Sequence, residues 1–316
     1  MMKSQLNPAD SILLIGDCNL TASVSVCLLN AGHEVDVYTT DPETYKSHFE
    51  MHIASQQLHI RRSSSGKQNI LDNIPARVEY KLVILITPEN FEIKKALLNR
   101  LAYSLQNDAI IAVNSESIAL NLLQGECKGR NLLALNWSEP AHTTFFLEII
   151  YHDNEDLALT IKSLAKLHWG KDPYIVESNG IRSRLLSAMA REAAFLIDNE
   201  YASVEDIDRA CRNDAGYYLP FSGNCRYMDL MGTYAYGMVM KDLNPNLSTN
   251  KSFPAFFQKI LDEGRRGMKN EKGFYNYGED DIINWEKTME EFSYSIQSVI
   301  ERYPFNYTKN KEAIID

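Results

Sequence analysis

The first candidate for chemistry is the turn from Gly16 to Thr21, which follows the earliest apolar run of the sequence. Ser11–Ile15 has the pattern of a buried strand, and Ala22–Asn30 that of a helix. In such a turn, Gly-x-Gly-x-x-Gly brings the backbone close to the pyrophosphate of a dinucleotide, and the helix N-terminus offers it N–H groups. Cys18 and Thr21 replace the second and third glycines here, so we expect them to hinder phosphate approach and helix packing. The turn is either a weakened dinucleotide site or an ordinary strand-to-helix connection.

A second candidate is His142, because imidazole titrates near neutral pH and can act as a general base. The sequence has seven histidines, the last of them His168, and the others lie in expected front helices or loops. His142 follows Pro140-Ala141, so it is expected in a loop. A lone histidine in a loop is more often structural than catalytic, and both roles stay open.

The elements that position these residues alternate between strands and helices. After Ala31-Gly32, Glu34–Tyr38 completes a strand-helix-strand unit. A helical stretch follows over Phe91–Leu105, and further strand-length apolar runs lie at 81–86, 109–113 and 131–135. This alternation is typical of an α/β protein with a doubly wound parallel sheet.

The alternation ends near Ser178. A helix over Asp156–Leu167 and a strand over Tyr174–Glu177 continue the sheet pattern, whereas amphipathic helices follow Gly180. Among these helices, Ser203 with Asp206 three residues later resembles a capping box. We therefore predict a Rossmann-like domain over residues 1–178 and a helical substrate or dimerisation domain over 179–316.

Composition excludes several classes of function. The net charge of −10 argues against sequence-independent nucleic-acid binding, which needs clustered Lys and Arg. The five cysteines are scattered without C-x-x-C spacing, which predicts neither disulfides nor a zinc site and favours a reducing cytoplasm. No apolar run approaches the ~20 residues that a membrane span requires, so no membrane anchor is expected.

Several motifs occur together in a specific order. The front half holds Pro88-Glu89-Asn90 with Lys94, and Asn114-Ser115-Glu116-Ser117; the rear half holds Val204–Asp208, Met228–Gly232 and Lys272–Tyr277. In this order the chain resembles the 3-hydroxyacyl-CoA dehydrogenase family, including its gulonate and carnitine dehydrogenase branch. The resemblance implies a C-terminal all-α domain like that of 6-phosphogluconate dehydrogenase and a homodimer formed through it, with the helices of Leu185 and Ala235 as candidates.

The resemblance also implies a cofactor site. NAD is the expected cofactor, and NADP is not excluded: the family's acid for the adenosine ribose is replaced by Thr39, with Asp41 two residues later, and no Arg or Lys follows at once. The residues implied to contact the cofactor come from four segments, each following a predicted strand: Gly16, Cys18, Asn19, Leu20, Thr39, Pro88, Glu89, Lys94 and Asn114.

The family's catalytic strip, H-x-x-N-P, matches Asn136-Trp137-Ser138-Glu139-Pro140, with Glu148 at the position of the family Glu that orients the His. The general base is thus replaced by Asn136, whose amide cannot accept the substrate proton as imidazole does. The family Ser and Asn that hold the substrate oxygens match Glu116 and Ser183. His142 is a substitute base in this interpretation.

The replacements make the implied pocket more acidic. Glu116, Glu139 and Glu148 could bind a cationic group, chelate an ion, or leave one Glu with a raised pKa as base. Alternatively, Glu116 and Glu139 point to solvent. Only about 40 residues separate the second strand from Lys81, shorter than the family's CoA-binding insertion; within them, the basic segment His59–Lys67 could contact a phosphate or form a solvated turn.

The sequence therefore predicts an NAD(H)-linked oxidoreductase acting on the 3-hydroxy or 3-keto group of an acyl-CoA or related β-hydroxy acid. Two alternatives stay open. One is a catalytically degenerate member that acts as a ligand-binding or assembly protein, and the other is a cofactor-independent lyase or hydratase that uses the acidic cleft.

Overall fold

The computed structural model describes residues 6–7, 10–59, 66–75, 79–106 and 108–303. The chain divides into two compact units, Met1–Ser183 and Arg184–Asp316. The division lies a few residues beyond the Ser178 boundary expected from the sequence.

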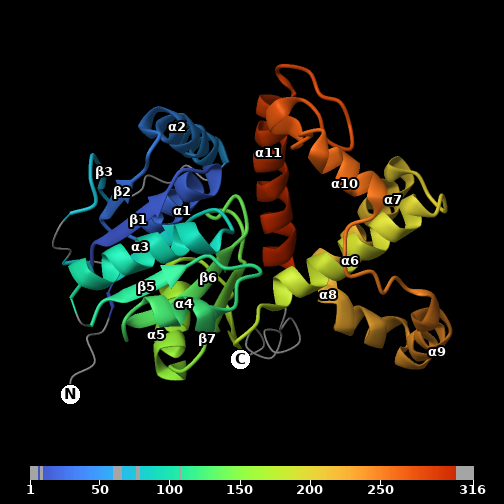
Figure 1. Ribbon diagram of the computed structural model, residues 1–316, viewed down its shortest axis with the longest axis horizontal. Coiled ribbons are helices and arrows are strands. Elements are labelled where there is room, and N and C mark those ends of the chain that lie inside the picture. Colours follow the sequence, from blue (N-terminus) through green and yellow to red (C-terminus); the bar gives the residue numbers. More distant parts are fainter. Residues whose placement is uncertain (1–5, 8–9, 60–65, 76–78, 107, 304–316) are drawn as a thin grey trace. The chain divides into compact units, whose positions relative to one another are not determined.

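The first unit is built on one eight-stranded sheet of order β3-β2-β1-β4-β5-β6-β7-β8 (Figure 1). Its strands are β1 (Ile12–Gly16), β2 (Val35–Tyr38), β3 (Gln68–Leu71), β4 (Leu82–Ile86), β5 (Ile110–Val113), β6 (Asn131–Trp137), β7 (Leu147–Tyr151) and β8 (Tyr174–Glu177). The strand order reverses between β1 and β4, where ligands of doubly wound sheets bind beside the carboxyl ends of the strands. This arrangement places the turn after Gly16 at the expected ligand edge.

Helices cover both faces of this sheet. One buried cluster joins Leu14 and Ile84 to helices α1 (Asn19–Asn30), α2 (Pro42–His59) and α5 (Glu155–His168). The other joins Leu13 and Leu85 to α3 (Phe91–Ser104) and α4 (Leu120–Glu126). Neighbouring strand residues thus point to opposite apolar layers, which explains why these strands are apolar throughout.

The sequence predicted a parallel sheet, but one strand pair of the sheet is antiparallel. The pairing of β6 with β7 is antiparallel, and β8 pairs parallel to β7. The connection over residues 138–146 is too short for a crossover between parallel strands, which needs a dozen or more residues. In the resulting pair Asn136 lies directly opposite Glu148.

The second unit is helical in its described part. It contains the rest of α6 (Ile181–Asp198), α7 (Val204–Ala210), a π-helical segment (Cys211–Ala215), α8 (Gly216–Met231), α9 (Thr233–Leu243), α10 (Ala255–Asp262) and α11 (Asp281–Arg302), with 3-10 turns at Asn244–Asn246 and Met268–Asn270. The predicted capping box of Ser203 and Asp206 begins α7. Helix α8 is kinked at Gly223, whose φ of 67° is one that glycine adopts without strain.

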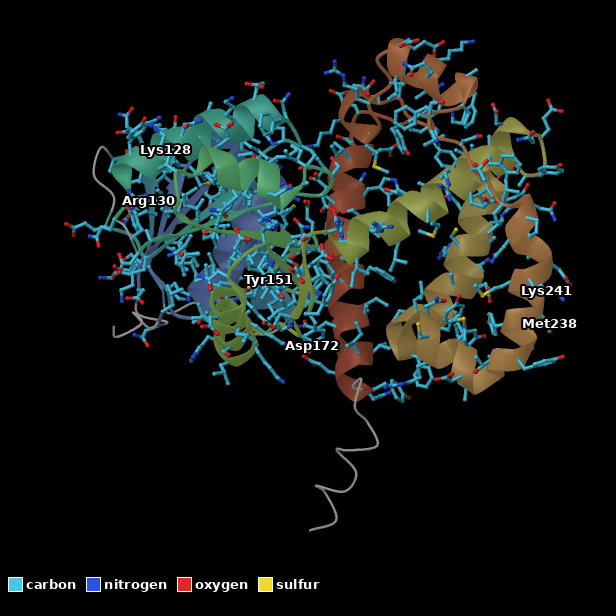
Figure 2. All side chains as sticks on the ribbon, turned by 60° about the horizontal axis from the view of Figure 1, so that its bottom comes forward. Lys128, Arg130, Tyr151, Asp172, Met238 and Lys241 are labelled. Carbon is cyan, nitrogen blue, oxygen red and sulfur yellow. The ribbon has the colours of Figure 1, made fainter. Side chains whose placement is uncertain are left out.

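The described part of this second unit has little apolar interior. Its large apolar side chains are mostly exposed, for example Leu185 at 65% on α6, Leu230 at 66% on α8 and Val239 at 54% on α9. Met238, labelled with Lys241 in Figure 2, is 40% exposed on α9. Tyr294 is the one aromatic or aliphatic side chain of this unit that is buried among residues 184–303.

Candidate active site

The turn after β1 keeps the geometry of a dinucleotide loop. A Cβ at Gly16 would overlap the Ile86 carbonyl oxygen and Thr21 Oγ1, so only glycine fits there. The expected hindrance by Thr21 does not occur, because Thr21 is fully buried over Gly16 and α1 still packs on the sheet. Cys18 lies at the N-cap of α1 and makes no side-chain capping bond. The helix N-terminus therefore remains able to accept a phosphate.

The side chain of Asn19 links this turn to Glu139 and His52 by hydrogen bonds. It is buried, donates to Glu139 Oε1 at 2.6 Å and bonds His52 Nε2 at 2.8 Å. Leu20 packs partly buried against the cluster beneath α1. Asn19 and Leu20 would thus contact a phosphate through their backbone N–H groups rather than through their side chains.

Thr39, at the end of β2, does not present its hydroxyl to a ligand. Its Oγ1 donates to Asp17 Oδ1 at 2.8 Å and accepts from the Asp41 N–H at 3.2 Å. The Thr40 N–H donates to the same Asp17 oxygen at 2.5 Å. The acid at the end of β2 is therefore Asp17, which belongs to the turn after β1.

Lys94 and Asn114 connect the residues that follow β4 and β5 by hydrogen bonds. The Asn114 amide pairs with the Thr87 backbone in both directions, at 2.9 Å each. Lys94 is fully buried and donates to Thr87 Oγ1 and to the Asn114 backbone oxygen at 2.6 Å. Burial lowers the pKa of Lys94, while Glu89 at 3.4 Å opposes that shift. Both residues predicted to touch the cofactor thus also hold the sheet edge together.

Glu89 follows the exposed Pro88. Its carboxylate accepts hydrogen bonds from successive backbone N–H groups of one turn. Its Oε1 accepts from the N–H groups of Glu116, Ser117 and Ile118 at 2.7 to 3.0 Å. Burial alone would raise the pKa of Glu89, but these donors and Lys94 outweigh it and lower the pKa. The turn that carries Glu116 is therefore fixed by a carboxylate.

Asn136 is buried, and its amide is committed to its neighbours. Its Nδ2 donates to the Ser115 carbonyl and to Glu148 Oε2, both at 2.9 Å, and its Oδ1 accepts the Ser115 N–H at 2.8 Å. Both amide protons are thus used within the protein. Asn136 thus pairs with the backbone of Ser115 after β5, just as Asn114 pairs with the backbone of Thr87 after β4.

Glu148 receives four hydrogen bonds and is fully buried. Besides Asn136, the donors are the Tyr174 hydroxyl at 2.9 Å and the N–H groups of Ile181 and Arg182 at 2.6 and 3.1 Å. The last two are the first N–H groups of α6, where a carboxylate is favoured by the helix dipole. Burial, followed by the hydrogen bond to Glu148, raises the pKa of Tyr174.

Glu116 lies beside this clamp and is reachable from solvent. Its two carboxylate oxygens pair with the Arg182 guanidinium and accept the Ser183 hydroxyl, and its side chain is 34% exposed. Arg182 also stacks 5.7 Å from the Phe146 ring centroid. A cavity of about 30 Å³, enough for ordered water, is lined by Ser115–Leu120 and Ser178–Gly180.

His142 and Glu139 make their contacts away from the Asn136–Glu148 pair. Asn136 and Glu148 share the face of Ala134 and Ile150, which pack with α3 and α4. His142 instead lies against His52 of α2, with ring centroids 5.0 Å apart. Glu139 bonds Asn19, so the three carboxylates do not form one cluster.

Arg182, Tyr174 and Asp17 were missed by the sequence analysis. Arg182 precedes the matched position Ser183, and Tyr174 begins the strand predicted over Tyr174–Glu177, but neither residue belongs to a motif. Their role depends on α6 starting beside β7, which no local pattern reveals. The basic segment His59–Lys67 lies largely outside the described residues, since 60–65 are not among them.

Both units match one protein family. Residues 11–178 match the NAD-binding domain of 3-hydroxyacyl-CoA dehydrogenase, and residues 181–277 match the C-terminal domain of the same enzyme. The chain belongs to the 3-hydroxyacyl-CoA dehydrogenase family. This membership confirms the predicted family and fold class, and it supports the predicted NAD cofactor and oxidoreductase class.

Curated relatives of this family member are similar at low identity. The fatty acid oxidation complex subunit alpha of Shewanella oneidensis is 25% identical over 247 residues, covering 74% of this chain and 34% of the relative. The 5-formyl-3-hydroxy-2-methylpyridine 4-carboxylate 5-dehydrogenase of Mesorhizobium japonicum is 25% identical over 202 residues, covering 62% and 65%. This chain thus spans about a third of the first relative and two thirds of the second.

Solved structures of the family share the fold. A crystal structure of the pyridine carboxylate 5-dehydrogenase, described as an NAD+ dependent dismutase, superposes with a TM-score of 0.86 at 22% identity, covering 93% of this chain and 99% of that one. FadB2 of M. tuberculosis gives 0.68 at 17% identity, covering 86% and 100%.

Proposed function

We propose that this family member is an NAD-linked oxidoreductase that interconverts the 3-hydroxy and 3-keto forms of an acyl-CoA or related β-hydroxy acid. The observation that supports this most is the turn at Gly16, where only glycine fits, at the strand-order reversal within a matched NAD-binding domain. NAD, when bound, accepts the hydride from the carbon that carries the hydroxyl. The chain must then remove the hydroxyl proton.

Glu116 is the proposed proton acceptor. Of the two carboxylates beside α6, Glu116 is partly exposed, whereas Glu148 is buried under four donors. Glu116 also occupies the position that in the family holds the substrate oxygen. The Ser183 hydroxyl donates to the same carboxylate and would orient the substrate oxygen beside it. Arg182 pairs with the Glu116 carboxylate and holds it in place beside Ser183.

Asn136 and Glu148 are positioning residues in this proposal. Asn136 holds Ser115, the residue before Glu116, and Glu148 holds the start of α6, which carries Arg182 and Ser183. Their hydrogen bond fixes the two halves of the Glu116 site against each other. This proposal assigns no role to His142, whose ring lies against His52 of α2.

The substrate class rests on the connection between β2 and β4. The described residues there contain one helix, α2, and the short strand β3. The connection between β2 and β4 is therefore shorter than the CoA-binding insertion that the family resemblance implies. A small β-hydroxy acid is therefore as suitable a substrate as its CoA thioester.

The test compares turnover with nucleotide binding. Purified protein is incubated with NAD and either 3-hydroxybutyrate or 3-hydroxybutyryl-CoA, and NADH formation is followed by absorbance. We expect Glu116→Gln to lower kcat by about 100-fold, because it removes a general base, and to leave the dissociation constant for NADH unchanged. Turnover by the variant equal to that of the wild type would refute this role of Glu116. Nucleotide binding without turnover of either substrate by the wild type would favour the degenerate alternative.

We also propose that the protein is a homodimer formed by its helical unit. Exposed apolar side chains on α6, α8 and α9 leave this unit without an interior of its own, and such surfaces usually meet a partner. Sedimentation equilibrium should give twice the chain mass of 36.0 kDa. A monomer at micromolar concentration would contradict the proposal.

We place the protein in the cytoplasm. All five cysteines are free, which suits a reducing compartment. In the described part of the chain, no helix is long and apolar enough to cross a membrane.

A further inference from the structure

The acid at the end of β2 comes from an unexpected place. Dinucleotide folds usually carry it on the second strand, where it binds the hydroxyls of the adenosine ribose. That position holds Thr39 in this chain, and Asp17 reaches it from the turn after β1. Thr39 Oγ1 and the Thr40 N–H both donate to Asp17 Oδ1, so the carboxylate is fixed by two bonds.

The other nearby acid has a structural task. Asp41 Oδ1 accepts the Thr44 N–H at 3.1 Å and so caps the first turn of α2. This hydrogen bonding lowers the pKa of Asp41. Asp41 also donates its own N–H to Thr39 Oγ1, which orients the Thr39 hydroxyl toward Asp17. Thr39 and Asp41 together position Asp17.

Asp17 has an oxygen available for a ligand. Its side chain is exposed, and within the described residues both bonds from Thr39 and Thr40 end on Oδ1. Oδ2 can therefore accept a hydrogen bond from a ribose hydroxyl. Gly16, the neighbouring residue, is where the backbone must approach the dinucleotide, so the two contacts would come from adjacent residues of one turn.

We infer that Asp17 is the adenosine-ribose acid of this protein and that it selects NAD over NADP. This inference rests on the proposed NAD-linked function. The carboxylate accepts bonds from the ribose hydroxyls of NAD, whereas the 2′-phosphate of NADP would bring like charge against it. The departure of Thr39 from the family pattern is thereby a relocation of the acid, and not its loss.

Dissociation constants for NADH and NADPH, measured by nicotinamide fluorescence, test this inference. Asp17→Asn keeps an oxygen for Thr39 and Thr40 but removes the charge, and it should weaken NADH binding tenfold or more. The preference for NADH over NADPH should shrink by at least the same factor. Asp153→Asn is the matched control, because it removes the charge of an exposed aspartate that follows the antiparallel strand β7, and its affinity for NADH should stay within twofold of the wild type.

A third variant guards against misfolding of Asp17→Asn. Thr39→Val leaves the carboxylate but removes the hydroxyl that positions it, so NADH binding should weaken a few-fold. Thermal midpoints of all variants show whether they are folded. Unchanged NADH affinity in a folded Asp17→Asn would overturn the inference while leaving the proposed function intact. Absence of NADH binding by the wild type would overturn both.

Discussion

Replacing Asn136 by Ala tests whether this residue is a structural clamp. The substitution removes two bonds to the Ser115 backbone, each contributing about 1 kcal/mol, and one to the Glu148 carboxylate, contributing about 2 kcal/mol. Since Ser115 is buried, water cannot easily replace the lost partners. We expect the free energy of unfolding to fall by about 4 kcal/mol.

Urea unfolding followed by tryptophan fluorescence suits this measurement. Trp137 and Trp169 are buried in the first unit and lie 5.7 Å apart between ring centroids, whereas Trp285 of the second unit is 55% exposed. The signal therefore reports chiefly on the unit that contains Asn136. Because a two-unit protein need not unfold in one step, the transition of this unit is analysed by its own midpoint.

Asn154→Ala is the matched control. Asn154 caps α5 through a bond to the Leu157 N–H, and such a cap contributes about 1 kcal/mol. If Asn136→Ala lowers the free energy of unfolding by no more than Asn154→Ala does, Asn136 is not a structural clamp. Its amide would then be a candidate for contacting the substrate.

Two further variants, at Glu89 and Tyr174, test hydrogen-bonded groups by the pH dependence of stability. The lowered pKa of Glu89 means that its charge stabilises the fold above the ordinary value of 4.5, and that this contribution is lost as pH falls through the lower folded pKa. Glu89→Gln should thus cost about 2 kcal/mol near neutral pH and progressively less as the pH falls below 4.5, measured by urea midpoints; a cost independent of pH would contradict this. The raised pKa of Tyr174 implies stability that is present below the ordinary value of 10.0 and lost as pH rises through the folded pKa. Tyr174→Phe should therefore unfold more easily than the wild type near neutral pH but lose less stability under alkaline conditions, and parallel pH profiles of the two proteins would exclude this role.

Much of the fold could be predicted because its strands are buried on both faces. Leu82–Ile86 and Ile110–Val113 are apolar at every position, and this signal needs no tertiary information. Gln68–Leu71 was missed because a half-polar edge strand of four residues has no such pattern. Leu147–Tyr151 was not predicted as a strand, and its antiparallel direction depends on the length of the preceding loop and not on composition.

The site was predicted less completely, for a physical reason. The sequence showed that Asn136 and Glu148 are twelve residues apart, and β6 and β7 place them opposite each other. It could not show that the Asn136 amide would be used by Ser115, or that Asp17 would reach Thr39. These contacts join the ends of different strands, so they exist only once the sheet has formed.

The most direct test of the whole account is a titration of the purified wild-type protein with NADH, followed by nicotinamide fluorescence. The turn at Gly16, the open N-terminus of α1 and the carboxylate of Asp17 predict saturable binding, with NADPH binding more weakly. Absence of saturation at millimolar NADH would contradict the account and leave a dinucleotide fold that works without its cofactor.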